Sequence, residues 1–280
     1  MNHIEDGIVA AADAQSLGGK APAYYLQPRN LLDNSDFTNA VNQRGASSYS
    51  GNFVRSIDRW LTAEGPSGSV SVKIEDGGIT FTTSGGGTVY LIQRFEKGYL
   101  DLSKQHTIVA YMADGTVSFN GYIDTSEETM DGVNVTFPSG SKIKCVALYE
   151  GIYTADTLPP YVPKGYAAEL AECQRYYLRL YENRTMLYGN SGSSSGTGAR
   201  LFLPTPVPMR INPTVSAFSV GVSKPSGVTN NATYTPTSAN VTASGIGFYG
   251  DFSSAISSSP TYVAVTATIQ IAAVELSADL

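Results

Sequence analysis

Carboxylates are the side chains with which this chain could do chemistry, and they form three clusters. The clusters are Asp33/Asp36, Asp124/Glu127/Glu128/Asp131 and Glu169/Glu172. Glycoside hydrolysis needs two carboxylates that face each other across a cleft. The group from Asp124 to Asp131 lies in a predicted turn between strands, and Glu169 and Glu172 are three residues apart on a short predicted helix. Both patterns are typical of solvated surfaces, so we do not expect a hydrolytic pair.

Nucleophilic catalysis would need a general base in a triad context. The histidines are His3, in a helix-prone terminus, and His106, at the start of a predicted strand. No Gly-x-Ser-x-Gly motif accompanies them. A Cys-x-x-Cys pair and an EF-hand loop are also missing from the sequence. We therefore predict no catalytic residue, no enzyme activity, no cofactor and no metal site of these kinds.

Charge and composition exclude other classes. The chain has 280 residues, a net charge of −6 and only 15% charged residues, against about 25% in ordinary globular chains. A nucleic-acid partner would need a basic patch, and none is visible. No apolar run approaches the roughly 20 residues that span a bilayer, and no signal peptide opens the chain. We expect synthesis in a bacterial cytoplasm, without membrane insertion. Cys145 and Cys173 are expected to be reduced, half-buried thiols.

The elements that must position any site are strands. Val89, Leu91 and Gln93 share one face of a predicted strand, opposite Tyr90 and Ile92. Such alternation and the Gly-rich turns between runs favour a sandwich or jelly roll over residues 30–163. The predicted strands of this part are residues 70–74, 79–83, 88–95, 107–112, 117–123, 133–137 and 143–149.

A proline-rich run over residues 158–177 separates two β-rich parts. Pro159, Pro160 and Pro163 cannot join a sheet ladder, residues 166–172 suit a short helix, and a strand follows from Arg175. We interpret this run as a hinge. The predicted domains are residues 1–29, a helical attachment and oligomerisation segment, residues 30–163, and residues 164–280.

The second part is predicted to be another antiparallel β-sandwich, which makes the fold all-β. Its predicted strands are residues 175–181, 199–203, 214–222, 233–234, 247–251 and 262–271. Polar loops are expected at residues 189–198, 223–233 and 251–260. Residues 1–17 are helix-prone, and a lone helix of this length is marginal in water. It therefore needs a partner, either copies of itself or another protein.

Several of these segments resemble bacteriophage or prophage tail-fibre and baseplate-associated proteins. The similar segments are residues 1–30, the run at residues 158–177 and the chain end, while NLLDNSDF at residues 30–37 resembles the opening strand of jelly-roll carbohydrate-binding modules. The resemblance implies a virion protein, a homotrimer and contact with other tail or baseplate proteins through the N-terminal segment. It also implies a C-terminal receptor-binding domain that holds a bacterial surface polysaccharide. Related jelly rolls often hold a calcium ion near this strand, for which Asp33, Asn34 and Asp36 would supply oxygens.

Aromatic residues are the candidates for sugar binding. Trp60, in the sequence SIDRW, could be a sugar platform, but similar phage sequences favour core packing, with Arg59 pairing with Asp58 or Asp36. The 18 tyrosines, among Ser, Gly and Asn, match the composition of adaptable recognition loops. The predicted ligand-binding residues, in or beside loops of the second part, are Tyr188, Asn190, Asn231, Tyr234 and Tyr249.

The predicted function is therefore attachment of a virion to a bacterial surface glycan without catalysis. Three weak glycan sites on one trimer axis would gain avidity. The alternatives are a polysaccharide depolymerase, a structural virion decoration or baseplate protein, and a bacterial adhesin unrelated to a virion. The missing secretion signal argues against the adhesin.

Overall fold

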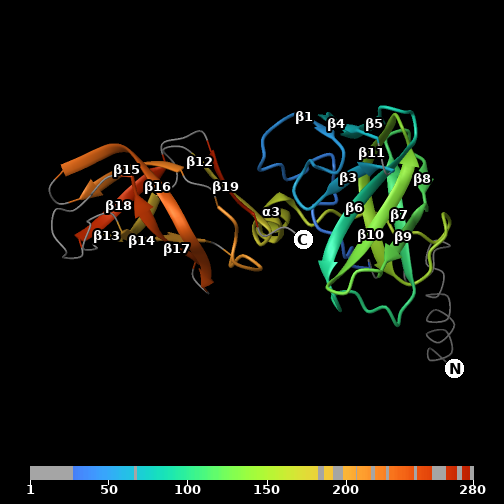
Figure 1. The fold of residues 1–280 in the computed structure, drawn as a ribbon. Coiled ribbons are helices and arrows are strands. Elements are labelled where there is room, and N and C mark those ends of the chain that lie inside the picture. The colour runs from blue at the N-terminus through green and yellow to red at the C-terminus, as the bar shows by residue number, and fades with distance from the viewer. Residues whose placement is uncertain are drawn as a thin grey trace, which may run out of the picture. The chain divides into compact units, whose positions relative to one another are not determined.

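The structure is a computed structural model that describes residues 28–65, 68–181, 186–191, 198–205, 207–215, 218–224, 227–242, 245–253, 263–269 and 273–277. The chain divides into two compact units, Met1–Asn42 with Ala46–Tyr166, and Gln43–Gly45 with Ala167–Leu280. Strands dominate both units and pair antiparallel throughout (Figure 1). The described part has one helix, α3 (Tyr166–Gln174), where a short helix was predicted. The all-β prediction is confirmed.

The first unit contains two antiparallel sheets (Figure 1). The first sheet runs in the order β1 (Ser48–Gly51), β4 (Val70–Glu75), β5 (Gly78–Thr83), β11 (Ser141–Glu150), β7 (His106–Met112) and β8 (Val117–Ser118). The second sheet runs in the order β2 (Val54–Arg55), β3 (Leu61–Glu64), β6 (Thr88–Glu96), β10 (Met130–Pro138) and β9 (Gly121–Asp124). Residues 117–123 were predicted as one strand, but the chain leaves the first sheet after β8 and enters the second at β9.

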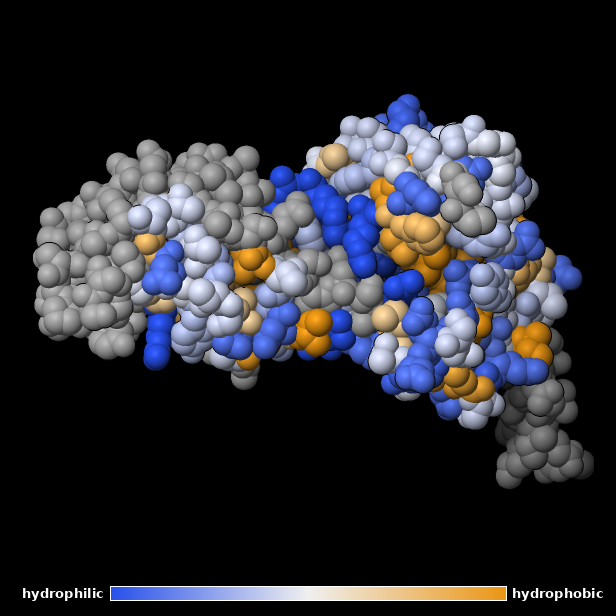
Figure 2. Space-filling view, in the orientation of Figure 1, coloured by the Kyte–Doolittle hydropathy of each residue, from blue (hydrophilic) through white to orange (hydrophobic). Residues whose placement is uncertain are grey.

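Alternating side chains of both sheets build one core. In β6, Val89 and Leu91 are 0% exposed, and in β4 and β5 Val72 and Phe81 are 0% and 1% exposed. All four belong to the same buried cluster. Burial of an aliphatic or aromatic side chain of this size contributes roughly 1.5–3 kcal/mol to folding. The core therefore lies between the two sheets, and the apolar residues left outside form separate patches on the visible face (Figure 2).

The opening segment, NLLDNSDF, is bonded tightly to the sandwich. The Asn30 carboxamide oxygen accepts hydrogen bonds from the backbone N–H groups of Leu32 and Leu148, at 3.1 and 2.9 Å. The Asn34 amide group donates to the carbonyl oxygens of Val41 and Asp58, at 2.8 and 2.7 Å. Buried polar groups need such partners, so these two asparagines fix the path of the segment.

Trp60 is a core residue, as predicted. It is 1% exposed, its indole N–H donates to the Asn34 carbonyl at 2.8 Å, and its ring meets Phe37 edge-on with centroids 5.5 Å apart. The predicted strand at this point is wrong, because Trp60 lies in a turn directly before β3. Arg59 adopts a positive φ of 72° there. Its guanidinium Nε lies 3.0 Å from Oδ2 of Asp33.

The segment after β11 packs onto the outer face of the first sheet. Tyr153, Leu158 and Tyr161 lie against a small buried cluster that includes Val109 and Tyr149. This contact buries the Tyr149 phenol and raises its pKa. The Tyr161 hydroxyl lies 3.0 Å from the hydroxyl of Ser35. The proline-rich run interpreted as a hinge is therefore attached, up to Lys164, to the unit that it leaves.

The second unit is built around a closed barrel (Figure 1). Around the barrel the strands are β13 (Met186–Ser191), β14 (Gly198–Pro204), β17 (Gly245–Phe252), β16 (Gly227–Thr242), β15 (Phe218–Lys224) and β18 (Val263–Ile269). A separate pair joins β12 (Tyr177–Tyr181) to β19 (Ala273–Ser277). The prediction of a second sandwich differs from this arrangement, because β18 pairs with both β13 and β15 and closes the sheet.

The predicted loop at residues 223–233 is wrong. Strands β15 and β16 form a hairpin in which Lys224 is opposite Gly227 and Val222 is opposite Thr229, so the SKPSGVTNNAT segment is mostly strand. Its small polar residues were read as a loop, but the two strands of this hairpin pair with each other. Strand β13 was likewise missed.

The two cysteines are free and buried. Cys145 is 7% exposed and Cys173 is 0% exposed, so the predicted reduced state is confirmed, and burial is more complete than expected. Burial raises the pKa of the Cys145 thiol to about 12. At neutral pH this thiol is protonated and unreactive.

Candidate functional site

Strand register in the barrel brings several predicted ligand-binding residues together. In one row Tyr188 of β13 is opposite Phe202 of β14, and Phe202 is opposite a glycine of β17. In the next row Asn190 is opposite Arg200, and Arg200 is opposite Tyr249. We call the four residues Tyr188, Arg200, Phe202 and Tyr249 the barrel platform.

The barrel platform faces outward because its neighbours along each strand face the core. Leu187, Leu201 and Phe248 are 0%, 2% and 0% exposed, and successive side chains of a strand point to opposite faces. Tyr188 and Tyr249 are accordingly 50% and 39% exposed. Two phenol rings, a phenyl ring and a guanidinium group thus share one patch of the outer surface.

Arg200 lies over a ring of the platform. Its Cζ is 5.3 Å from the centroid of the Tyr249 ring, a distance at which the cation is attracted to the ring face. Arg200 makes no ion pair or hydrogen bond through its side chain in the part of the chain that the structure describes. Its N–H donors are therefore free to bind solvent or a ligand.

Glycines shape the platform. A Cβ on Gly189 would lie 1.9 Å from the Arg200 carbonyl oxygen, and a Cβ on Gly250 would lie 2.2 Å from that of Thr235. These two glycines let neighbouring strands approach closely. A Cβ on Gly247 would instead be 3.8 Å from the nearest atom, on Tyr249. Gly247 therefore has room for a small side chain opposite Phe202.

The remaining predicted ligand-binding residues are placed differently. Asn190 shares the row of Arg200 by register. Asn231 lies in β16 rather than in a loop. The side chains of both asparagines lie outside the described residues.

Tyr234 belongs to the interior of the barrel. It is 0% exposed, its ring is 5.2 Å from that of Phe252, and its hydroxyl donates to the Ala199 carbonyl at 3.4 Å. Burial raises the pKa of its phenol. A surface ligand has no access to this side chain, so the structure assigns Tyr234 to the core.

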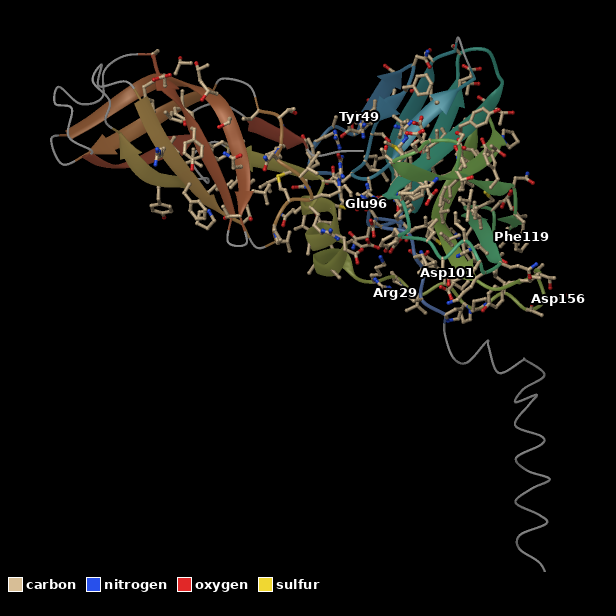
Figure 3. The ribbon with its side chains drawn as sticks, turned by 60° about the horizontal axis from the view of Figure 1, so that its bottom comes forward. Arg29, Tyr49, Glu96, Asp101, Phe119 and Asp156 are labelled. Atoms are coloured by element: carbon tan, nitrogen blue, oxygen red, sulfur yellow. The ribbon has the colours of Figure 1, made fainter. Side chains whose placement is uncertain are left out.

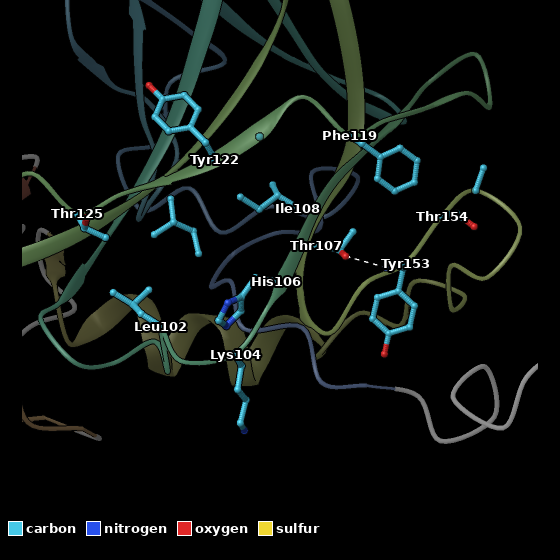
Figure 4. Close-up of a pocket in the computed structure, with 13 residues that line it drawn as sticks. Leu102, Lys104, His106, Thr107, Ile108, Phe119, Tyr122, Thr125, Tyr153 and Thr154 are labelled. Atoms are coloured by element: carbon cyan, nitrogen blue, oxygen red, sulfur yellow. Dashed lines mark hydrogen bonds between the residues drawn. The ribbon is translucent and has the colours of Figure 1, made fainter.

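A second concave surface, which we call the edge groove, lies on the first unit (Figure 4). It has a volume of about 950 Å³ and opens between β7 and β9, at one open side of the sandwich. Tyr122 lies on one rim and Phe119 and Tyr153 on the other (Figure 4). Tyr122 and Phe119 are 50% and 38% exposed. Figure 3 shows Phe119 and Asp101 on this unit.

The groove combines an unpartnered histidine nitrogen with balanced charge. The Nε2 atom of His106 is buried and has no hydrogen-bond partner. Lys104 pairs with Glu150 at 2.7 Å and with Asp101 at 3.7 Å, and the hydrogen bond to Glu150 raises the Lys104 pKa. The groove therefore offers aromatic rings and a nitrogen to a ligand, without an unpaired cation.

Sequence reasoning missed the edge groove because its residues are scattered along residues 102–155. One signal was available at Gly121, where a Cβ would lie 2.5 Å from Cγ2 of Ile108. A glycine flanked by exposed Phe119 and Tyr122 marks the point at which β9 passes close to β7.

The acidic cluster after β9 is held by a lysine. Asp131 lies in β10, not in a turn as predicted, and its carboxylate is 0% exposed and 3.0 Å from Nζ of Lys97. The same ammonium group donates to the carbonyl oxygens of Thr125 and Glu127, at 3.1 and 3.0 Å. A backbone hydrogen bond from Ser126 lowers the pKa of Asp124. Lys97 thus ties the loop to the sheet.

The residues considered as calcium ligands already have ion-pair or hydrogen-bond partners. Asp33 pairs with Arg59 at 3.0 Å and with Lys164 at 3.4 Å, and two cations beside one carboxylate oppose a third positive charge. Asp36 accepts hydrogen bonds from the backbone and hydroxyl of Thr38. Within the described ranges, no group of three or more His, Cys, Asp or Glu side chains is arranged to hold a metal ion.

Comparisons with protein-family models, with curated proteins and with solved structures give no match to this chain. Among the described residues, no helix combines the length and the apolar character needed to cross a membrane.

Proposed function

We propose that this chain is a receptor-binding protein of the phage or prophage tail-fibre type, which attaches a virion to a bacterial surface polysaccharide without catalysis. The observation that carries the proposal is the barrel platform, where Tyr188 and Tyr249 are exposed and Phe202 is partly exposed beside Arg200 on one face. Aromatic rings give large amphipathic contact at a low entropy cost. The apolar face of a pyranose packs on such rings while polar side chains bind its hydroxyl groups.

The edge groove supports the same function from the first unit. Its exposed rings, Phe119 and Tyr122, flank a site in which Nε2 of His106 has no hydrogen-bond partner. A concave site with apolar walls and a few polar groups suits a small ligand. A saccharide hydroxyl, which can donate or accept, would give this nitrogen a partner.

Binding without hydrolysis is supported by the state of the carboxylates that were candidates for catalysis. Asp131 is buried against Lys97, and Asp124 is bonded to its own turn. These two carboxylates do not have the facing arrangement that retaining and inverting glycosidases need. A depolymerase would instead release reducing ends from a polysaccharide, which a reducing-sugar assay detects.

The wider assignment includes a jelly-roll path for the first unit, a homotrimer, a place in the virion tail and contact with other tail or baseplate proteins through residues 1–29. Two antiparallel sheets around one core support the jelly roll. The homotrimer rests on the sequence resemblance and on avidity, because linked weak sites bind a polymer together.

The test uses the full chain on an array of bacterial capsular and O-antigen polysaccharides. We expect binding to a subset of these polysaccharides, and we expect the double variant Tyr188→Ala/Tyr249→Ala to weaken it at least tenfold. Ile211→Ala is the matched control, since Ile211 is 47% exposed on the same unit and outside the platform. No binding to any polysaccharide would favour the alternative of a structural virion protein.

A further inference from the structure

We infer that the barrel platform selects an acidic saccharide, a pyranose that carries a carboxylate, and that Arg200 is the residue that binds this carboxylate. The inference rests on the proposed function, because it names the class of glycan that the same surface takes. Three observations carry it: the position of Arg200 beside aromatic rings, its lack of a partner among the described residues, and the different charge balance of the edge groove.

Arg200 sits in the middle of the platform and is held there. It lies between Asn190 and Tyr249 in the register, and its guanidinium is over the Tyr249 ring, with Cζ 5.3 Å from the centroid. This contact leaves the N–H donors of the guanidinium without a hydrogen-bond partner among the described residues. Those donors match the two oxygens of a carboxylate in a bidentate pair.

The positive charge of Arg200 is not neutralised within the described residues. The nearest acidic position in the register is Asp251, which is opposite Gly198 and therefore one diagonal step from Arg200. No ion pair joins Arg200 to Asp251 or to another described carboxylate. In a chain with a net charge of −6, an exposed and unpaired guanidinium among aromatic rings is a local exception to the acidic character.

The aromatic residues next to Gly247 give the sugar ring an apolar surface beside this charge. Gly247 has no side chain, and a Cβ there would still be 3.8 Å from Tyr249 and 3.9 Å from Asn240. A pyranose seated over Gly247 would have Phe202 and Tyr249 as neighbours. Its carboxylate would then reach Arg200 in the adjacent row.

In the edge groove, unlike the barrel platform, the cation is paired with carboxylates. The preference for acidic glycans is therefore expected at the barrel platform alone. The cation of the groove, Lys104, is matched by Glu150 and Asp101. An anionic sugar would gain no unpaired cation there. We therefore expect selection for acidic glycans to depend on Arg200 and to be unaffected by changes in the groove.

The experiment compares each polysaccharide of the array in three forms: native, carboxyl-reduced and dephosphorylated. We expect the full chain to bind native acidic polysaccharides about tenfold more tightly than their carboxyl-reduced forms, since a charge-assisted pair contributes about 1.5 kcal/mol or more. Dephosphorylation should leave binding unchanged. A loss of binding on dephosphorylation alone would assign the anion to phosphate and overturn the carboxylate.

Substitutions of Arg200 separate the effect of its positive charge from the effect of its planar guanidinium geometry. Arg200→Gln should remove the preference, so that native and reduced forms bind equally, and Arg200→Lys should retain only part of it, because an ammonium lacks the planar fork. Arg175→Gln is the control, since it removes the same charge from a guanidinium 5.9 Å from the Tyr176 ring. Circular dichroism of each variant checks that it is folded.

The outcomes distinguish this inference from the proposed function. Equal binding of native and reduced forms by the unchanged protein, or an undiminished preference in Arg200→Gln, would overturn the acidic-sugar inference and leave glycan attachment intact. Absence of binding to every form would overturn both.

Discussion

Single aromatic residues in this chain have opposite roles that their sequence context barely distinguishes. Trp60 and Tyr234 are 1% and 0% exposed and belong to the two cores, whereas Tyr188 and Tyr249 are half-exposed on the barrel. For the tyrosines the difference is the parity of each residue relative to the sheet, because a strand turns alternate side chains inward. Trp60 is instead placed in the core by the turn before β3.

Replacement of Trp60 tests the structural role of this residue. Trp60→Phe removes the donor to the Asn34 carbonyl and leaves a small cavity, so we expect a loss of about 2 kcal/mol in the free energy of unfolding. Urea denaturation followed by circular dichroism measures it. Phe53→Ala, at a side chain that is 59% exposed, should change stability by no more than about 0.5 kcal/mol. Loss of glycan binding at full stability would contradict the core role of Trp60.

Burial of the thiols has a chemical consequence. The native protein should not react with a thiol reagent such as DTNB at pH 8, and two thiols should react after unfolding in guanidinium chloride, because Cys145 and Cys173 are both buried. Rapid labelling of the native protein would show that one of these sites opens easily.

The raised pKa of Cys145 also predicts a pH dependence. Burial favours the neutral thiol in the folded state, so its contribution to stability is complete below the unfolded pKa. It is lost as the pH rises from about 9.0 towards 12. Thermal melts between pH 8 and 11 should therefore decline less steeply for Cys145→Ala than for the unchanged chain. Parallel curves for the two proteins would contradict the assigned shift.

At the scale of elements, strand pairing converts a scattered set of residues into a surface. Tyr188, Arg200 and Tyr249 come from three strands, and their register alone makes them neighbours. The glycines between them set how closely those strands approach. The platform therefore depends on close strand packing as much as on its own side chains.

Two glycine substitutions test this dependence. Gly250→Ala places a Cβ 2.2 Å from the Thr235 carbonyl oxygen, and backbone there cannot move without disturbing the pairing of β16 and β17. We expect a loss of about 2 kcal/mol or more in the stability of the second unit. Gly247→Ala, with its nearest contact at 3.8 Å, should keep the fold and only weaken glycan binding. Similar thermal stability of both variants would contradict the assigned contacts.

Strands and helices were predicted correctly where a local residue pattern determines them. The predictions were wrong where pairing between strands distant in the sequence determines the structure. Strand β6 and helix α3 follow from alternation and from a short helix-prone run after prolines. The start of β16 was read as a loop because Asn230 and Asn231 are typical of turns, although this part of β16 pairs with β15. Closure of the barrel depends on which strands meet, and no local pattern reveals that.

Only some residues of the candidate site were predicted from the sequence. Tyr188 and Tyr249 were named from composition, and they lie on one face. Arg200 and Phe202 were missed because an isolated arginine or phenylalanine in a strand has no local signature of recognition. Tyr234 was misplaced because its inward parity follows from pairing opposite Phe252.

For the molecule as a whole, the proposed trimer predicts a mass. Light scattering of the full chain should give three times the 29.7-kDa chain mass at working concentration, and binding to immobilised polysaccharide should exceed binding to short oligosaccharides through avidity. A monomer mass, or equal affinity for polymer and oligomer, would contradict the trimer.

The closed barrel has one further consequence for a protein that would be displayed in many copies. An open sheet exposes a row of unpaired N–H and C=O groups that can pair with another chain. In the barrel, β18 completes the circle between β13 and β15, so each of the six strands pairs with a neighbour on both sides over at least part of its length. Copies of the protein that are packed closely together then have no fully unpaired barrel strand with which to form an intermolecular sheet. The outer faces of their barrels therefore remain exposed to solvent.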